Sequence, residues 1–375
     1  MEVREGGPED LTTAVGEGGG QVIRQPCRAR GDIAVKGDDH PAGRIVVQDL
    51  LGECVEDVFL CGLPACHGLS VTPHADRRVV RVPAPDESLA LTVNEWFRAT
   101  GRDLPWRRPG FGAWGVLVSE VMLQQTPVAR VIPRLAEWLE RWPTPADLAA
   151  VPAGEAVRAW NRLGYPRRAL NLHAAAVAIA EVHGNVVPTD LRDLLALPGI
   201  GDYTARAVAV FAHGQRHPVV DINVRRVLAR AVDGQAEPGP PSTTRDLAAM
   251  DDLLPLDDAE ARVTNAAVME LGAIVCTARA PRCDDCPIRD RCRWRAEGYP
   301  DYEGPRAAKQ KKFEGSDRQV RGLILAELRA SDVPVSQREI DAVWPDDVQR
   351  ARALLGLLAD GLAVGTPDDG YELPS

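Results

Sequence analysis

Apolar residues recur every three to four positions in successive segments from about Leu89 onward, and Pro or Gly residues separate one segment from the next. This is the spacing of amphipathic helices. It predicts helices over residues 89–99, 113–124, 128–141, 154–163, 167–183, 190–196, 202–213, 222–232, 243–253 and 258–275. Connections such as RWPTP and AEPGPPS contain the residues typical of turns. We therefore expect an all-α domain over residues 89–300.

Residues 1–88 show no sustained periodicity and are rich in Gly, Asp, Glu and Arg. We expect a low-structure N-terminal extension here, and one hypothesis is that it arises from a start codon placed too far upstream. The segment contains four cysteines and an adjacent histidine whose spacing matches no established metal site: Cys27, Cys54, Cys61, Cys66 and His67.

A second pattern follows a short polar linker at residues 301–312. Ser336 and Glu339 form a capping box before an apolar segment, and LAVGTPDDGYEL reads as two short strands about a turn. Three helices and a hairpin over 313–375 are typical of a winged-helix-like domain. Because this segment has 6 basic and 12 acidic residues, we favour a packing or protein-contact role over direct DNA contact, which stays the alternative.

The net charge of −10 is unevenly distributed, which keeps a nucleic-acid partner open. Residues 89–300 contain 25 basic and 25 acidic residues, and every basic residue among them is arginine. The lysines of the chain are Lys36, Lys309, Lys311 and Lys312. No apolar run is long enough to cross a membrane and no secretion signal opens the chain, so we expect a cytoplasmic protein. In that compartment cysteines are more often metal ligands than disulfides.

Four cysteines lie close together in the sequence CTARAPRCDDCPIRDRC, with the spacing C-x6-C-x2-C-x5-C: Cys276, Cys283, Cys286 and Cys292. Four thiolates suit either zinc or an iron–sulfur cluster. Zinc sites usually contain two C-x2-C pairs and only one is present, so the spacing favours a cluster. Six arginines in and just after this loop predict a face that attracts phosphate.

The segment LRDLLALPGIGDYTARAVAVFA places Leu197, Gly199 and Gly201 in a short loop between two helices. Glycines in such a loop allow backbone amides to point outward at a helix N-terminus, where they can hold a phosphate. The pattern indicates a helix-hairpin-helix, although a simple turn between helices has the same composition.

Two carboxylates are candidates for chemistry. Asp221 stands at the expected N-cap of the helix over 222–232, where a cap alone would explain it. Glu120 lies in WGVLVSEVMLQQT among apolar residues, and burial there would raise its pKa and retain a proton for general acid catalysis. An ion pair with an arginine is the alternative for Glu120.

With these motifs in place, the chain resembles the adenine DNA glycosylases of the MutY family from about Leu89 to Tyr299. The resemblance rests on RDLPWR (102–107), SEVMLQQT (119–126), LGY (163–165), NLH (171–173), LPGIGDYTA (197–205), NVRRVLAR (223–230) and MELGAIVC (269–276), which occur in this order. It implies a two-lobed helix-hairpin-helix glycosylase fold with a [4Fe–4S] cluster on the four cysteines. It also implies a monomer that binds double-stranded DNA containing adenine opposite 8-oxoguanine or guanine, and is associated with the nucleoid when bound.

The resemblance also implies roles for individual residues. Glu120 would protonate the departing adenine, Asp221 would stabilise the sugar cation, and Tyr203 and Asn223 would support both. Arg102, Trp106 and Arg107 would line the adenine pocket, and Gln125 and Tyr165 would enter the duplex. The remaining expected DNA or base contacts are Gln124, Thr126, Leu163, Leu197, Gly199 and Gly201.

The chain departs from the family at several points. Pro166 stands where many members have a second Tyr, and Ala266 where many have Glu or Gln. The 75 residues after Pro300 are too few for the Nudix-like domain with which the family reads 8-oxoguanine. Endonuclease III relatives have a lysine in place of Tyr203, and residues 37–308 contain none, so we expect a monofunctional glycosylase without lyase activity.

Two other functions are compatible with the sequence. One is a glycosylase that removes thymine or uracil opposite guanine on the same fold. The other is a non-catalytic iron–sulfur protein that regulates by binding DNA.

Overall fold

The computed structural model describes residues 14–15, 21–22, 87–305 and 312–375, and the chain divides between Val80 and Arg81 into two units. In the first unit, β1 (Ala14–Val15) pairs antiparallel with β2 (Gln21–Val22). The remaining expectations for residues 1–88, the possible start-site extension and the cysteines among them, fall outside the described residues.

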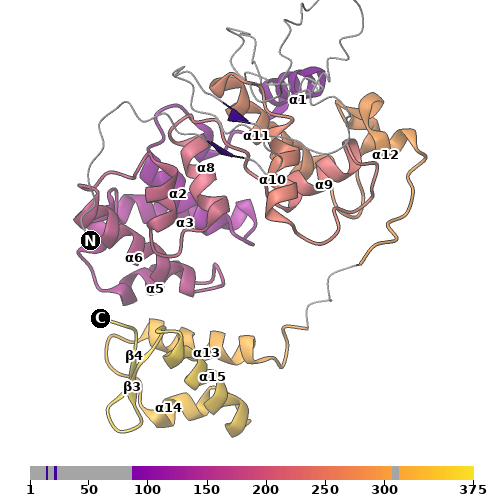
Figure 1. Ribbon diagram of the computed structural model, residues 1–375. Coiled ribbons are helices and arrows are strands. Elements are labelled where there is room, and N and C mark those ends of the chain that lie inside the picture. The colour runs from indigo at the N-terminus through magenta and orange to yellow at the C-terminus, as the bar shows by residue number, and fades with distance from the viewer. Residues whose placement is uncertain (1–13, 16–20, 23–86, 306–311) are drawn as a thin grey trace, which may run out of the picture. The chain divides into compact units, whose positions relative to one another are not determined.

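The larger unit contains two groups of helices, each with its own core (Figure 1). Buried residues of its C-terminal segment, such as Val320 and Leu357, belong to the first of these cores. The first group surrounds buried residues such as Leu117, Trp138 and Trp160. It consists of α2 (Ala113–Leu123), α3 (Val128–Arg141), α4 (Pro145–Ala149), α5 (Ala153–Trp160), α6 (Arg167–Val182), α7 (Leu191–Ala196) and α8 (Asp202–Phe211).

The second group surrounds Val93, Leu254 and Leu271, which are completely buried. It consists of α1 (Glu87–Thr100), α9 (Ile222–Ala231), α10 (Thr243–Asp251) and α11 (Asp258–Ile274), followed by the short α12 (Arg293–Ala296). Two lobes with separate apolar cores are the architecture that the resemblance implied. Functional side chains from both lobes can therefore meet where α2 and α8 face α9.

All ten helices expected over 89–275 are present, with ends that differ from the predicted ones by at most about three residues. Helix α4 was not predicted, because RWPTP reads as a turn. The Thr144 side chain accepts a hydrogen bond from the Asp147 amide and Asp147 caps in return, so a capping box starts a helix within that segment. Among the described residues before the C-terminal segment there are also three 3₁₀ turns, at Pro105–Arg107, Cys283–Asp285 and Arg289–Arg291.

The C-terminal segment forms the helices and hairpin that its pattern predicted. They are α13 (Asp317–Ala330), α14 (Gln337–Ala342), α15 (Asp347–Ala359), β3 (Val364–Thr366) and β4 (Gly370–Glu372). The predicted capping box of Ser336 and Glu339 is confirmed at the start of α14. β3 and β4 pair antiparallel, with Gly365 opposite Tyr371.

Hydrogen bonds to backbone carbonyls connect this segment to α5. The Gly154 amide donates to the Pro374 carbonyl at 2.7 Å, and Arg329 Nε donates to the Val157 carbonyl at 3.0 Å. In the opposite direction, Arg158 donates to the carbonyls of Arg329 and Ser331.

None of the described helices is both long enough and apolar enough to cross a membrane.

Candidate active site

Glu120 is buried on α2, with 6% of its surface exposed. Its neighbours along the helix, Leu117, Val121 and Met122, belong to the core of the first lobe. Burial, and to a smaller extent the nearby charge of Asp221, raise the pKa of Glu120, whereas a hydrogen bond from Tyr203 and the charge of Arg107 oppose the rise. Together these effects give Glu120 a pKa of about 7. A carboxyl group in this state can retain and donate a proton near neutral pH.

Tyr203 lies in the first turn of α8, which packs directly on α2. Burial and the charges of Glu120 and Asp221 raise the pKa of Tyr203 well above its ordinary value, so the phenol keeps its proton. Its hydroxyl donates to the Glu120 carboxyl. Tyr203 therefore interacts with both carboxyl groups, and the two lobes bring Glu120 and Asp221 into one electrostatic environment.

Asp221 is the N-cap of α9. Its Oδ1 accepts from the Val224 amide at 2.7 Å and its Oδ2 from the Asn223 side-chain amide, also at 2.7 Å. Burial raises the pKa of Asp221, against these hydrogen bonds and the charge of Arg226, which lower it. Both carboxyl groups thus have raised pKa values. What distinguishes them is the set of donors that stabilises the ionised form of Asp221.

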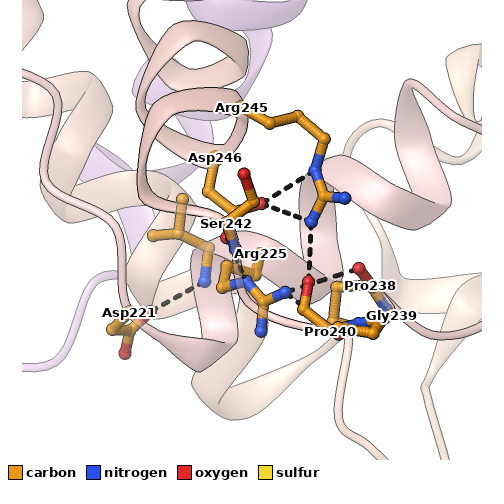
Figure 2. A network of polar contacts seen from close by, with 9 residues as sticks. Asp221, Arg225, Pro238, Gly239, Pro240, Ser242, Arg245 and Asp246 are labelled. Carbon is orange, nitrogen blue, oxygen red and sulfur yellow. Dashed lines mark hydrogen bonds and ion pairs between the residues drawn. The ribbon is translucent and has the colours of Figure 1, made fainter. Parts of the chain in front are cut away.

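A second set of polar contacts, which does not involve Glu120 or the carboxylate of Asp221, also anchors the start of α9. Figure 2 shows Arg225 and Arg245 converging on Asp246, and Arg225 Nε is 2.7 Å from Asp246 Oδ2. The Ser242 amide donates to the same oxygen, and Arg225 Nη2 donates to the Gly239 carbonyl. The loop between α9 and α10 is therefore fixed to the first turn of the helix that Asp221 caps.

A chain of hydrogen bonds connects Asp221 to the cysteine loop. Arg226 Nη2 donates to Asn223 Oδ1 at 2.8 Å and to the Gly272 carbonyl at 2.7 Å, and Arg226 Nε donates to the Cys276 carbonyl at 2.7 Å. α9 and α11 approach closely because Gly272 has no side chain. A Cβ there would lie 2.7 Å from the Asn223 Cβ.

Arg102 and Arg107 converge on one buried carboxylate, Glu270 of α11. Arg102 Nε lies 2.6 Å from Glu270 Oε1, and Arg107 Nη2 lies 2.9 Å from Oε2. Burial acts to raise the pKa of Glu270, but hydrogen bonds from the two arginines lower it to about 2. Trp106, between them in the sequence, is partly buried against the core of the first lobe. Both guanidinium groups are thus held in fixed positions.

The hairpin loop connects α7 to α8. Gly199 has φ +71°, and a Cβ at this position would lie 2.4 Å from Cβ of Asn171, so glycine is required there. Gly199 and Gly201 are exposed, whereas Leu197 is buried in the core. The exposed part of the loop is therefore backbone, and Leu197 serves to anchor it.

Two further loops carry the other expected DNA contacts. Gln125 and Tyr165 are exposed and both have left-handed φ values, +53° and +46°. Thr126 and Leu163 are buried, and Thr126 Oγ1 lies 3.3 Å from the Leu163 carbonyl, so these two residues join the loops. Gln124 is partly buried and its amide donates to the Thr204 hydroxyl of α8 at 3.2 Å.

The four cysteines are free thiols that line a common cavity, with Val275 and Trp294 among its other walls. Arg230 of α9 is buried beside them. Its Nη1 donates to Cys276 Sγ at 3.4 Å and to the Thr277 carbonyl at 2.8 Å, and its guanidinium stacks on the Trp294 ring at 4.7 Å. In the described part of the chain, no three His, Cys, Asp or Glu side chains are grouped so as to hold a single metal ion.

Comparison with known proteins decides the family. Residues 118–250 match the HhH-GPD superfamily base excision DNA repair protein, and residues 276–292 match the iron-sulfur binding domain of endonuclease III. The adenine DNA glycosylase of Mycobacterium tuberculosis is 53% identical over 280 residues, which are 74% of this chain and 91% of the relative. That of Mycolicibacterium smegmatis is 54% identical over 279 residues, 74% of this chain and 93% of the relative. The chain belongs to the adenine DNA glycosylases.

One solved structure, of a thermostable thymine-DNA glycosylase, shares 25% identity with this adenine DNA glycosylase family member at a TM-score of 0.52. The match covers 57% of this chain and 97% of that one. A thymine-DNA glycosylase of Aeropyrum pernix is 32% identical over 209 residues, 55% of this chain and 93% of the relative. The two-lobed helical fold with a hairpin and a cysteine loop is thus the fold of base excision glycosylases.

The cysteine loop of this adenine DNA glycosylase fits a [4Fe–4S] cluster. Four free thiols around one cavity form a tetrathiolate donor set, and N–H groups such as Arg230 Nη1 directed at sulfur are typical partners of cluster thiolates. Cys276, Cys283, Cys286 and Cys292, which the spacing and the resemblance single out, would hold the cluster within the matched residues 276–292. A bound cluster would cross-link this loop.

Sequence reasoning missed three residues that organise the site. Glu270, Arg226 and Arg168 are buried charged residues with partners far along the chain. Glu270 lies within the quoted motif MELGAIVC and Arg226 within NVRRVLAR, so a charge inside an otherwise apolar periodic segment was the available signal. The partners themselves could not be read from local sequence.

Proposed function

We propose that this protein hydrolyses the N-glycosidic bond of adenine mispaired with 8-oxoguanine or guanine in duplex DNA. The observation that carries the proposal is the Glu120 carboxyl, which has a pKa of about 7 and lies in the same environment as Asp221. The names of the most similar relatives support adenine as the base that is removed.

The arrangement suits a reaction through a sugar cation. As the bond between the sugar and adenine breaks, its electron pair moves to the base, and Glu120 donates a proton that neutralises the departing adenine. Asp221 in its ionised form stabilises the positive charge left on the sugar. Water then adds to the sugar and gives an abasic site, while Tyr203 orients Glu120 and Asn223 orients Asp221.

We infer that the enzyme is monofunctional. A lyase of this fold forms a Schiff base through a lysine amine, and residues 37–308 contain no lysine. Tyr203, near the start of α8, has a hydroxyl that stays protonated and cannot replace the amine. The product strand should remain intact until alkali cleaves it.

DNA would be held by several parts of the larger unit. The exposed amides around Gly199 and Gly201 suit a phosphate, and the arginine-rich cysteine loop adds positive charge. Gln125 and Tyr165 are suited to fill the space that an extruded adenine leaves. Arg102, Trp106 and Arg107 would form the wall of the pocket that receives the base.

We further propose that residues 89–300 are the glycosylase domain, that 301–312 are a linker, and that 313–375 pack on it as a winged-helix-like domain. Hydrogen bonds from Arg158 to the Arg329 carbonyl and from Arg329 to the Val157 carbonyl support a packing role. The enzyme would act as a monomer on DNA in the cytoplasm, associated with the nucleoid.

The test is a glycosylase assay on duplexes containing adenine opposite 8-oxoguanine, adenine opposite guanine, and thymine or uracil opposite guanine. Each reaction is divided, and one half receives alkali before the strands are separated. Glu120→Gln and Asp221→Asn should lose activity, and Glu137→Gln, on the exposed surface of α3, should retain it.

Each outcome has a consequence. Alkali-dependent cleavage at adenine supports the proposal, and the ratio of the rates opposite 8-oxoguanine and opposite guanine measures the selectivity of a chain with Ala266. Cleavage at thymine or uracil alone would replace it with the mismatch glycosylase that the Aeropyrum pernix relative exemplifies. If the protein binds DNA but cleaves none of the duplexes, the function that remains is that of a non-catalytic DNA-binding regulator.

A further inference from the structure

Two residues with exposed side chains have disfavoured backbone conformations, and they lie on neighbouring loops. Gln125 follows α2 with φ +53°, and Tyr165 precedes α6 with φ +46°, next to Gly164 with φ +84°. Residues other than glycine rarely adopt this left-handed region, and they remain there when the surrounding structure holds them. Something must therefore hold both loops.

Arg168, in the first turn of α6, makes contact with both loops. It is 8% exposed, and its three nitrogens reach seven acceptors, of which six are backbone carbonyls. On the side of α2 these are the carbonyls of Val121, Met122 and Gln124 and the Thr126 hydroxyl, at 2.9, 3.1, 2.6 and 3.1 Å. On the other side they are the carbonyls of Leu163, Gly164 and Tyr165, at 3.5, 2.9 and 3.4 Å.

Each of these acceptors is an uncharged group. Burial lowers the pKa of Arg168 to about 10, yet the side chain remains cationic at neutral pH. Its guanidinium also lies against two aromatic rings, 5.1 Å from the centre of Trp160 and 5.5 Å from that of Tyr165. The planar fork suits this position, because it can donate in two directions at once, which a lysine ammonium cannot do in the same plane.

We propose that Arg168 is a positioning residue that sets the distance and orientation between the loops of Gln125 and Tyr165, so that both side chains enter the duplex together when a base is extruded. The inference rests on the proposed function, because it assigns these two side chains to extrusion. Arg168 itself is buried beneath the loops and acts through them.

The consequence is a dependence on base pairing. If Arg168 positions the extrusion loops, its loss should slow reaction of an adenine that must be pulled from a pair and stack. It should matter far less for an adenine that is already unpaired, because extrusion of such a base costs little. A purely structural role would slow both reactions equally.

The experiment compares single-turnover rates on two duplexes, one with adenine opposite 8-oxoguanine and one with adenine opposite an abasic-site analogue. For Arg168→Met we expect a loss of about 100-fold on the first duplex and only a few-fold on the second. Arg168→Lys should not restore the rate on the first, since it keeps the charge without the fork. Arg134→Met, at a partly exposed arginine of α3, serves as the control with unchanged rates.

Equal losses on the two duplexes, or no loss on either, would overturn the proposal. Thermal melting and cluster absorbance establish whether each variant is folded. Should Arg168→Met fail to fold, Thr126→Val is the second variant. It removes the hydroxyl that accepts from Arg168 and lies close to the Leu163 carbonyl, and we expect the same difference in rate loss between the two duplexes, with a smaller magnitude. If the wild-type protein releases adenine from neither duplex, the proposed function fails, and this result is distinct from failure of the positioning role.

Discussion

The side-chain amide of Asn223 donates to Oδ2 of Asp221 at 2.7 Å, and the oxygen of the same amide accepts from Arg226 at 2.8 Å. Asn223 is thereby oriented from both ends. A buried carboxylate that stabilises a cation must be ionised and fixed in position, and preorganised donors of this kind provide both. The relationship ties the state of Asp221 to Arg226 and the start of the cysteine loop.

The first prediction concerns this pair. Asn223→Ala removes one donor from Asp221, so the single-turnover rate on adenine opposite 8-oxoguanine should fall about 100-fold, with little change in the affinity for DNA. Rate and affinity are measured separately, by quenched-flow and by fluorescence anisotropy. An unchanged rate would show that the Val224 amide alone is sufficient to hold Asp221.

The second prediction concerns the pH dependence of the rate. Glu120 must be protonated to act as a general acid, and its pKa is about 7. The rate should therefore fall as pH rises above about 7, approaching about tenfold for each further pH unit. Glu120→Gln should be slower by at least about 100-fold and should lack this dependence. A wild-type rate that stays level to pH 9 would contradict the assignment.

The third prediction uses the same pKa to predict stability. The pKa of Glu120 is higher in the folded protein than its ordinary value of 4.5, so its favourable contribution is complete below about pH 4.5 and is lost as pH rises through about 7. The Glu120→Gln variant has no such titrating group. The difference in free energy of unfolding between variant and wild type, measured by urea denaturation, should therefore shift in favour of the variant by up to roughly 3 kcal/mol between pH 5 and pH 8. A constant difference between the two proteins would argue against a buried, protonated Glu120.

The fourth prediction has the opposite sign. Glu270 has a folded pKa of about 2 because Arg102 and Arg107 bind its ionised form. Its contribution is present above about pH 4.5 and is lost as pH falls toward about 2, so Glu270→Gln should be destabilised most at pH 6. The free energies of unfolding of variant and wild type are compared between pH 2.5 and 6, and the gap should narrow as pH falls. Glu137→Gln, on the surface, provides the comparison without such a change.

The fifth prediction concerns the cluster. Cys286→Ser removes one of four thiolates, so the purified variant should contain less iron and lose the visible absorption of the wild-type protein. The loop of residues 276–292 should then become susceptible to proteases, because the iron–sulfur bonds no longer cross-link it. Full iron content in the variant would indicate that three cysteines are enough.

Local sequence was sufficient for most of the fold. Helical spacing placed the helices because each has an apolar face that its own residues define, and Gly199 marked the hairpin because the loop needs glycine at this position. It failed at α4, where the capping box of Thr144 and Asp147 outweighed the turn residues around it.

The site was predicted less completely, because part of it depends on contacts between distant segments. The raised pKa of Glu120 followed from its apolar neighbours in the same helix. The pairing of Arg102 and Arg107 with Glu270 could not be predicted from local sequence, since the partners are more than 160 residues apart. Burial of Leu197 was likewise unforeseen, because an apolar residue in a loop can point to either side, whereas a core position for Leu163 was an alternative that its apolar side chain left open.

Gly272 has a wider consequence than close packing. The helix that leads into the iron-binding loop and the helix that Asp221 caps touch through a hydrogen atom where any other amino acid would place carbon. Even alanine would wedge the two apart at the point from which Arg226 reaches across. Repair activity and metal retention should therefore be lost together through a change at a position that contacts neither iron nor DNA.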